Sequence, residues 1–255
     1  MEHQSNGYVG THIQNGIASI EFYHPAGNSL PADLLATLAS EILAAGKDPA
    51  ITLIVIRSAG ERAFCAGASF EELMAVNTPQ NGMKFFSGFA GVINAIRTCG
   101  KLVIARIQGK AVGGGVGIAA AADICFATKH ASIRLSELAV GIGPFVIGPA
   151  VSRKIGVSAY SYMSLTPDEW QSAQWALDKG LYHAVLEDIA ELDNHLQTFT
   201  QNLLDYNPKA LQQMKHIFWE GTENWDTLLL ERAEISGNLV LSDFTRNAID
   251  QFKKK

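Results

Sequence analysis

Ile107-Gln-Gly-Lys-Ala-Val-Gly-Gly-Gly-Val-Gly-Ile-Ala-Ala-Ala-Ala-Asp123 joins an apolar run to an alanine-rich run through five glycines. Leu102–Ile107 predicts a buried strand, and Ile118–Ala122 predicts the start of a tightly packed helix. Glycine has no Cβ and allows positive φ angles, so a ligand can lie directly against the backbone. The helix start adds unpaired N–H donors and the positive end of a dipole. The stretch therefore suits an anion or a developing oxyanion, unless its glycines serve only close packing of helix on sheet.

The composition is that of an ordinary globular protein of the cytoplasm. Apolar residues make up 47% of the 255 residues and charged residues 18%, which is enough for a large core without cross-links. The net charge of −5, with no basic run before Lys253–Lys255, argues against a nucleic-acid partner. Three cysteines without metal-ligand spacing, and an N-terminus unlike a signal peptide, indicate a reducing compartment. The longest uncharged apolar stretch, Ala111–Ala122, is too short and glycine-rich to span a membrane.

Hydrophobic periodicity predicts an α/β arrangement in the first three quarters of the chain. Val9–Gln14 and Ile17–Tyr23 alternate in polarity around Asn15-Gly16, which predicts a hairpin. Further strands are expected at residues 51–57, 102–107, 124–128 and 132–135, and helices at residues 31–46, 70–76, 83–98 and 166–180. Residues 58–67 are expected to form a loop, and residues 141–149 an irregular segment. Strands separated by helices predict crossovers and a largely parallel sheet system.

The pattern changes near residue 187, after which only helices are expected. They are predicted at residues 189–204, 208–219, 227–241 and 243–254. We therefore divide the chain into an α/β core, residues 1–187, and a C-terminal helical region, residues 188–255. Helices that follow an α/β core can pack on that core or on neighbouring subunits.

Several chemical motifs are absent. No histidine pair has the spacing of a zinc-binding helix, and no phosphate loop ends in Gly-Lys-Ser/Thr. Gly67–Glu71 lacks the closing glycine of a nucleophile elbow. Gly115–Ala120 does fit G-x-G-x-x-A, and Glu137 lies 20 residues after Gly117. Dinucleotide binding therefore stays open as an alternative.

A second segment, Arg62–Leu73, also carries small residues before a helix, as the glycine stretch does. Its small residues follow a loop and precede a short helix, so they also expose backbone N–H groups. Two such donors, one from each loop, can hold a single oxygen between them. That arrangement is an oxyanion hole, in which the loss of one donor costs on the order of 3 kcal/mol.

Four motifs together resemble the crotonase family, also called the enoyl-CoA hydratase/isomerase superfamily. They are Asn28-Ser29-Leu30, Ala63-Phe64-Cys65-Ala66-Gly67-Ala68, Gly109 through Gly115 followed by Ala-Ala-Asp-Ile, and Ser136-Glu137-Leu138. The resemblance runs from about Ile13 to the C-terminus. It implies a crotonase-like spiral of ββα units, in which residues 188–255 form a helical trimerisation region. The assembly would be a homotrimer or a dimer of trimers.

The resemblance also implies an acyl-CoA substrate and no resident cofactor. The thioester oxygen would accept hydrogen bonds from Ala68 and Gly114, and an enolate that develops there would be stabilised. The adenine ring would lie against backbone near Ala66, and the terminal lysines would approach the CoA phosphates. The further substrate-binding residues expected beside these are Gly67, Gly113, Phe145 and Val146.

The chain departs from the hydratases of this family at three places. They carry two glutamates, and the first of them falls on Gly117 here, whereas the second is present as Glu137. The acid that often follows the first donor loop is Ser69. The hydratase sequence Ile-Pro-Gly-Ala-Gly-Gly is replaced by residues 142–149, Ile-Gly-Pro-Phe-Val-Ile-Gly-Pro, which are more similar to some enoyl-CoA isomerases.

One carboxylate is sufficient to move a double bond, because the same group can take a proton from C2 and return it to C4. A glutamate beside Phe145 and Val146 would have a raised pKa, which suits such a shuttle. The alternative interpretation of Glu137 is a helix-start carboxylate that faces solvent. We therefore expect double-bond isomerisation (3-enoyl-CoA to 2-enoyl-CoA) with Glu137 as the acid and base. Hydration, decarboxylation or other enolate chemistry, and acyl-CoA binding without catalysis are the alternatives.

Overall fold

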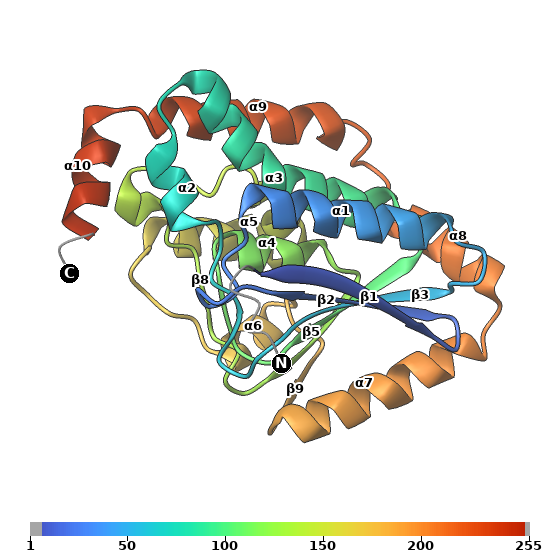
Figure 1. Cartoon of the computed structure of the whole chain (residues 1–255). Helices are drawn as coiled ribbons and strands as arrows, with labels where there is room; N and C mark the ends of the chain where they lie inside the picture. The colour runs from blue at the N-terminus through green and yellow to red at the C-terminus, as the bar shows by residue number, and fades with distance from the viewer. Residues whose placement is uncertain (1–6, 253–255) are drawn as a thin grey trace.

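A six-stranded sheet runs through the middle of the molecule, with helices on both of its faces (Figure 1). The structure is a computed structural model that describes residues 7–252. The strand order is β1-β2-β3-β5-β7-β9, and every neighbouring pair except β1–β2 is parallel. Its strands are β1 (Tyr8–Gln14), β2 (Ile17–Tyr23), β3 (Leu53–Ser58), β5 (Leu102–Ile107), β7 (Ile124–Thr128) and β9 (Ala184–Leu186).

The hairpin that opens the sheet was correctly predicted. β1 and β2 pair in register from Gln14↔Ile17 to Tyr8↔Tyr23. Asn15 and Gly16 between them both have positive φ angles, 50° and 80°, as a type I′ turn requires.

A second, three-stranded parallel sheet was missed in part by the sequence analysis. It consists of β4 (Ala63–Cys65), β6 (Lys110–Val112) and β8 (Ile133–Arg134). The expectation of a continuous loop at residues 58–67 is wrong, because Ala63 and Cys65 pair with β6. Strands of two or three residues are too short to show an alternating pattern, so periodicity does not reveal them.

The helices of the first part are α1 (Ala32–Lys47), α2 (Phe70–Ala75), α3 (Pro79–Thr98), α4 (Gly114–Ala121), α5 (Gly148–Leu165) and α6 (Ala173–Asp178), and a 3₁₀ helix, η1, covers Glu137–Val140. The predicted helix start at Thr166 is wrong. Thr166 ends α5, and its hydroxyl donates to the Tyr162 carbonyl. The next helix, α6, is capped by Ser172, whose Oγ accepts a hydrogen bond from the Trp175 N–H at 3.0 Å.

The C-terminal helices follow the predicted order closely. They are α7 (Ile189–Leu204), α8 (Pro208–Phe218), α9 (Trp225–Leu239) and α10 (Asp243–Phe252). α9 packs along α3 (Figure 1), and α10 contacts η1. The helical region therefore returns to the core of its own chain, although the division at residue 187 stays a prediction.

Alternate residues of the central strands face different layers, as the strand period of two requires. Ile54 and Val103 belong to the large core that includes α1, α3 and α4. Val55, Ile104 and Phe126 point to the opposite face, where α7 covers them with Leu192 and Leu196. The sheet is therefore buried on both faces, which is typical of parallel strands.

Candidate active site

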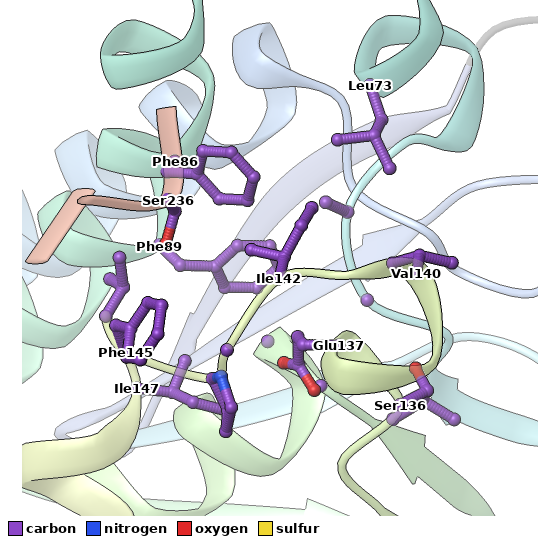
Figure 2. Close-up of a pocket in the computed structure, with 18 of the residues that line it drawn as sticks. Leu73, Phe86, Phe89, Ser136, Glu137, Val140, Ile142, Phe145, Ile147 and Ser236 are labelled. Carbon is purple, nitrogen blue, oxygen red and sulfur yellow. The ribbon is translucent and has the colours of Figure 1, made fainter. Parts of the chain in front are cut away.

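A cavity of about 240 Å³ lies where the small sheet, α3, η1 and the residue 142–147 segment meet. Figure 2 shows Phe86 and Phe89 on one side of it and Glu137 on the other, with Ile142 between them and Phe145 at the left. The structure brings every predicted site residue to the wall of this one cavity: Ala66, Gly67, Ala68, Gly113, Gly114, Glu137, Phe145 and Val146. Their chemical roles remain predictions.

The two predicted donor loops lie side by side at the cavity. A Cβ built on Gly67 would lie 4.0 Å from the Gly114 nitrogen. Gly67 has a φ of 95°, a conformation that favours glycine. Among residues 7–252, no group accepts a hydrogen bond from the N–H of Ala68 or of Gly114. Both donors are therefore free to bind a ligand oxygen.

The Asn28-Ser29-Leu30 motif holds the first donor loop in place. The Leu30 N–H donates to the Gly67 carbonyl at 2.8 Å, and the Ser69 N–H donates back to Leu30 at 3.3 Å. Asn28 is buried, and its Nδ2 donates to the carbonyls of Ala59 at 2.8 Å and Ala63 at 2.9 Å. These bonds fix the backbone on both sides of Ala68 while its own N–H stays unused.

Ser69 has a structural position at the end of this loop. Its side chain accepts a hydrogen bond from the Glu72 N–H at 3.3 Å and so caps α2. Glu72 in turn accepts from the Ala32 N–H at 2.9 Å, which ties α2 to the start of α1.

Glu137 lies at the first position of η1 with its carboxyl group buried in the cavity wall. A Cβ built on Gly113 would lie only 2.8 Å from Glu137 Oε1, so only glycine leaves room for the carboxyl there. Glu137 Oε2 is buried and has no hydrogen-bond partner among the described residues. The alternative of a solvent-facing carboxylate is therefore wrong.

The surroundings of Glu137 favour its neutral form. Burial raises its pKa to about 7, although its own backbone N–H and the positive charge of Arg134 act in the opposite direction. A carboxyl group with such a pKa exchanges its proton readily near neutral pH, as a general acid and base must.

Gly117, the position of the missing acid, does not line the cavity. It lies inside α4 and is buried. A Cβ built on it would lie 2.4 Å from Ile147 Cγ2 and 2.8 Å from Ile147 Cβ. The side chain of Ile147 therefore occupies the space into which a residue at position 117 would extend, and Ile147 itself reaches the cavity wall (Figure 2).

The dinucleotide alternative fails on local structure. Gly115 and Gly117 lie within α4, which begins at Gly114 after the short strand β6. A dinucleotide fingerprint needs these glycines in the turn between a strand and its helix. In addition, the carboxyl group of Glu137 lies in the cavity beside Gly113.

Several cavity residues escaped the sequence analysis. Phe85, Phe86 and Phe89 line the cavity from α3, a helix that the sequence predicted without assigning these residues a role at the site. Arg134 and Ser236 were not predicted at all. Ser236 comes from α9, about a hundred residues after Glu137, and no local pattern connects the two.

Neither a cluster of metal-ligating side chains nor a membrane-spanning helix is found in the described part of the chain. In residues 7–252, no three His, Cys, Asp or Glu side chains gather so that they could hold a metal ion. No helix in the same range is long and apolar enough to cross a membrane. The lysines expected to approach CoA phosphates, Lys253–Lys255, lie outside the described residues.

The fold is the one found in solved enoyl-CoA hydratase structures. The crystal structure of an enoyl-CoA hydratase from Bacillus halodurans matches with a TM-score of 0.88 at 23% identity, over 96% of this chain and 99% of that chain. This likeness confirms the expected crotonase-like α/β fold. Residues 12–249 match the enoyl-CoA hydratase/isomerase family model. The chain therefore belongs to the enoyl-CoA hydratase/isomerase family.

Relatives of the chain differ in the reaction that their names describe. A short-chain-enoyl-CoA hydratase from Clostridium acetobutylicum is 29% identical over 232 residues, 89% of this chain and 87% of its own. A peroxisomal Delta(3,5)-Delta(2,4)-dienoyl-CoA isomerase from Arabidopsis thaliana is 24% identical over 216 residues, 77% of this chain and 74% of its own. Family membership therefore leaves hydration and isomerisation both open.

Proposed function

We propose that this protein is an acyl-CoA enzyme that shifts a double bond, converting a 3-enoyl-CoA to a 2-enoyl-CoA through a thioester enolate. The observation that carries the proposal is the state of Glu137. Its carboxyl group is buried beside Gly113, and its Oε2 has no partner among the described residues. Ile147 fills the space beside Gly117, so a second acid has no place there.

The mechanism uses backbone donors and one carboxylate. The N–H groups of Ala68 and Gly114 hold the thioester oxygen, so negative charge that develops on it is stabilised. Glu137 removes a proton from C2, and the electrons of that C–H bond form the enolate. The same carboxyl group then returns its proton to C4, which leaves the double bond between C2 and C3. Phe86, Phe89 and Phe145 keep the reacting carbons in an apolar environment.

Hydration is the second candidate, because several relatives are named hydratases. In that reaction Glu137 would manage the proton of the added water, and another group would have to orient the water. The hydroxyl of Ser136 lies on the same cavity wall (Figure 2). Its presence there supports this candidate, although Ser136 is not an acid.

Turnover of two substrates by the purified protein separates the candidates. With 3-hexenoyl-CoA and crotonyl-CoA, we expect isomerisation of the first and little hydration of the second. Glu137→Gln should lower isomerisation by about 10²- to 10⁴-fold, the range for one general acid–base group. Hydration of crotonyl-CoA at a comparable rate would contradict the proposed isomerisation and favour hydration as the function. Unchanged turnover in Glu137→Gln would show that Glu137 is not the base. Binding of these acyl-CoA substrates without any turnover would favour a non-catalytic member of the family.

We also propose that the chain assembles as a trimer or a dimer of trimers through residues 188–255. Large apolar side chains stay exposed on α8, where Met214 is 44% exposed, Ile217 57% and Phe218 43%. Exposed apolar surface of this kind is typical of protein interfaces. Light scattering on the eluted protein measures the mass of the assembly, and a monomer would contradict the proposal.

A further inference from the structure

Two unpartnered polar groups face the same cavity. In residues 7–252, three buried side-chain nitrogen or oxygen atoms lack a hydrogen-bond partner: Arg57 Nε, Arg134 Nε and Glu137 Oε2. Arg57 Nε still lies 3.2 Å from a carboxylate oxygen of Glu21, which compensates its charge. Arg134 and Glu137 both line the cavity. The proposed proton transfer uses the carboxyl group of Glu137, whereas it gives Arg134 no role.

Arg134 forms no ion pair with any of the described residues. Within the described residues, no carboxylate lies within 4.0 Å of its guanidinium. The group lies instead over the ring of Trp170, 4.7 Å from the ring centre, and Lys110 lies 4.8 Å from the centre of the same ring. Stacking on an aromatic face leaves the N–H groups at the edge of the guanidinium free to donate. A buried donor without an acceptor costs free energy, so a ligand acceptor at this place would bind favourably.

The strand register places Arg134 at the cavity. Arg134 of β8 pairs with Val112 of β6. Paired residues of neighbouring strands share a face, so Arg134 projects on the same side as Val112, which also lines the cavity. The Gly113 N–H donates to the Arg134 carbonyl at 2.9 Å, which fixes the strand beside the glycine that contacts Glu137. Arg134 is therefore attached to the same wall as the proposed acid and base.

We infer that Arg134 forms an oxyanion subsite of this cavity and that the acyl group of the substrate carries a carboxylate at that subsite. A guanidinium donates two parallel hydrogen bonds to a carboxylate, which fixes its orientation. The position near Glu137 favours a group on the acyl chain over a phosphate, because the pantetheine arm separates the CoA phosphates from the thioester. This inference rests on the proposed function, since it assumes that an acyl-CoA enters the cavity.

Binding of unreactive ligands tests the subsite without depending on the reaction. Glutaryl-CoA and hexanoyl-CoA have similar length, and only the first carries an acyl carboxylate. Calorimetric titration should give tighter binding of glutaryl-CoA to the parent protein, by about 10- to 100-fold, which is the range of a hydrogen bond to a charged group. Arg134→Met should remove this preference and leave hexanoyl-CoA binding within about twofold. Arg134→Lys should retain part of it.

Matched controls distinguish the other outcomes. Lys110→Met removes a cation over the same Trp170 ring but outside the cavity wall, so it should keep the preference for glutaryl-CoA. If Arg134→Met weakens both CoA ligands equally but leaves hexanoyl-pantetheine unaffected, Arg134 contacts a CoA phosphate and the acyl carboxylate is excluded. If both ligands bind the parent protein with equal affinity, the carboxylate subsite is overturned but the proposed function is not. If neither ligand binds the parent, the proposed function fails and the subsite fails with it.

Discussion

At the scale of single residues, the contact between Gly117 and Ile147 has the largest consequence for the reaction. The sequence shows that an acid is missing at position 117, and the structure adds that its space is filled. Because the Ile147 Cβ itself would lie 2.8 Å from a Cβ at position 117, truncation of Ile147 to alanine does not relieve the clash. Both positions must change before a second acid can enter.

Gly117→Glu alone should therefore destabilise the protein without a gain in crotonyl-CoA hydration. Overpacking of this kind lowers the free energy of unfolding by about 1–3 kcal/mol. The double variant Gly117→Glu with Ile147→Gly should recover stability and raise hydration above the level of the parent. Ile147→Gly alone is the control for the cavity that the truncation leaves. A stable Gly117→Glu variant would show that Ile147 does not block this position.

The buried carboxyl group of Glu137 predicts a pH-dependent stability. Its folded-state pKa of about 7 lies above the value of about 4.3 for an unfolded glutamate, so the folded protein binds this proton more tightly. The carboxylate therefore destabilises the fold increasingly as pH rises from about 4.3 to 7. Glu137→Gln removes this cost, and its gain in unfolding free energy over the parent should grow to about 3 kcal/mol at pH 8. Urea unfolding at pH 5 and pH 8 measures the difference, and an equal gain at both would contradict the pKa shift.

At the scale of elements, the crossing of α3 and α9 shapes the cavity. A Cβ built on Gly82 of α3 would lie 2.7 Å from the Gly237 Cα of α9. This close approach brings Ser236 to the cavity wall beside Phe86 and Phe89 (Figure 2). A second contact joins α10 to the segment that carries Glu137. Thr245 Oγ1 of α10 donates to the carbonyl of Gly141 at 3.2 Å, and Gly141 follows the 3₁₀ helix η1 that begins with Glu137.

Gly82→Ala should push the two helices apart and lower the free energy of unfolding by about 1–3 kcal/mol. Gly91→Ala on the same helix is the matched control. Nothing lies within 4 Å of its Cβ position, so the higher helix propensity of alanine should stabilise the protein by up to about 1 kcal/mol. Urea unfolding of both variants measures the two effects, and the same sign for both would contradict the crossing geometry.

At the scale of the whole molecule, Asp123 connects the C-terminal helices to the sheet. Its Oδ2 accepts from the Val103 N–H at 2.7 Å and from Lys215 Nζ at 2.8 Å, and its Oδ1 accepts from Trp219 Nε1 at 2.8 Å. The side chains of Asp123 and Lys215 are only 3% and 2% exposed. Asp123, which ends the glycine-rich stretch Ile107–Asp123, therefore anchors α8 to β5.

Lys215→Met should lower the free energy of unfolding by about 3–5 kcal/mol, because it leaves the buried carboxylate of Asp123 without its counter-charge. Asp226→Asn provides the comparison, since Asp226 pairs with Arg97 but its side chain is 70% exposed. Asp226→Asn should lower the free energy of unfolding by less than about 1 kcal/mol. Similar losses in both variants would show that burial of the Asp123 pair does not matter.

Local sequence determined most of the elements of this protein and the two glycine-containing loops that meet at the cavity. Periodicity located the long strands and helices, Asn15-Gly16 located the hairpin, and the glycines located the backbone that meets at Gly67 and Gly114. These signals are local, because dihedral preferences and amphipathic faces belong to one segment at a time. Family resemblance rather than periodicity pointed to Glu137.

Only the tertiary structure decided what surrounds these residues. The burial of Glu137, the contact of Ile147 with Gly117, and the arrival of Arg134 and Ser236 at the cavity all depend on segments far apart in the chain. A sequence pattern shows which face of an element is apolar but not which element covers it. Desolvation, free space and unpaired donors are properties of the packed interior, so they appear only once the segments are together.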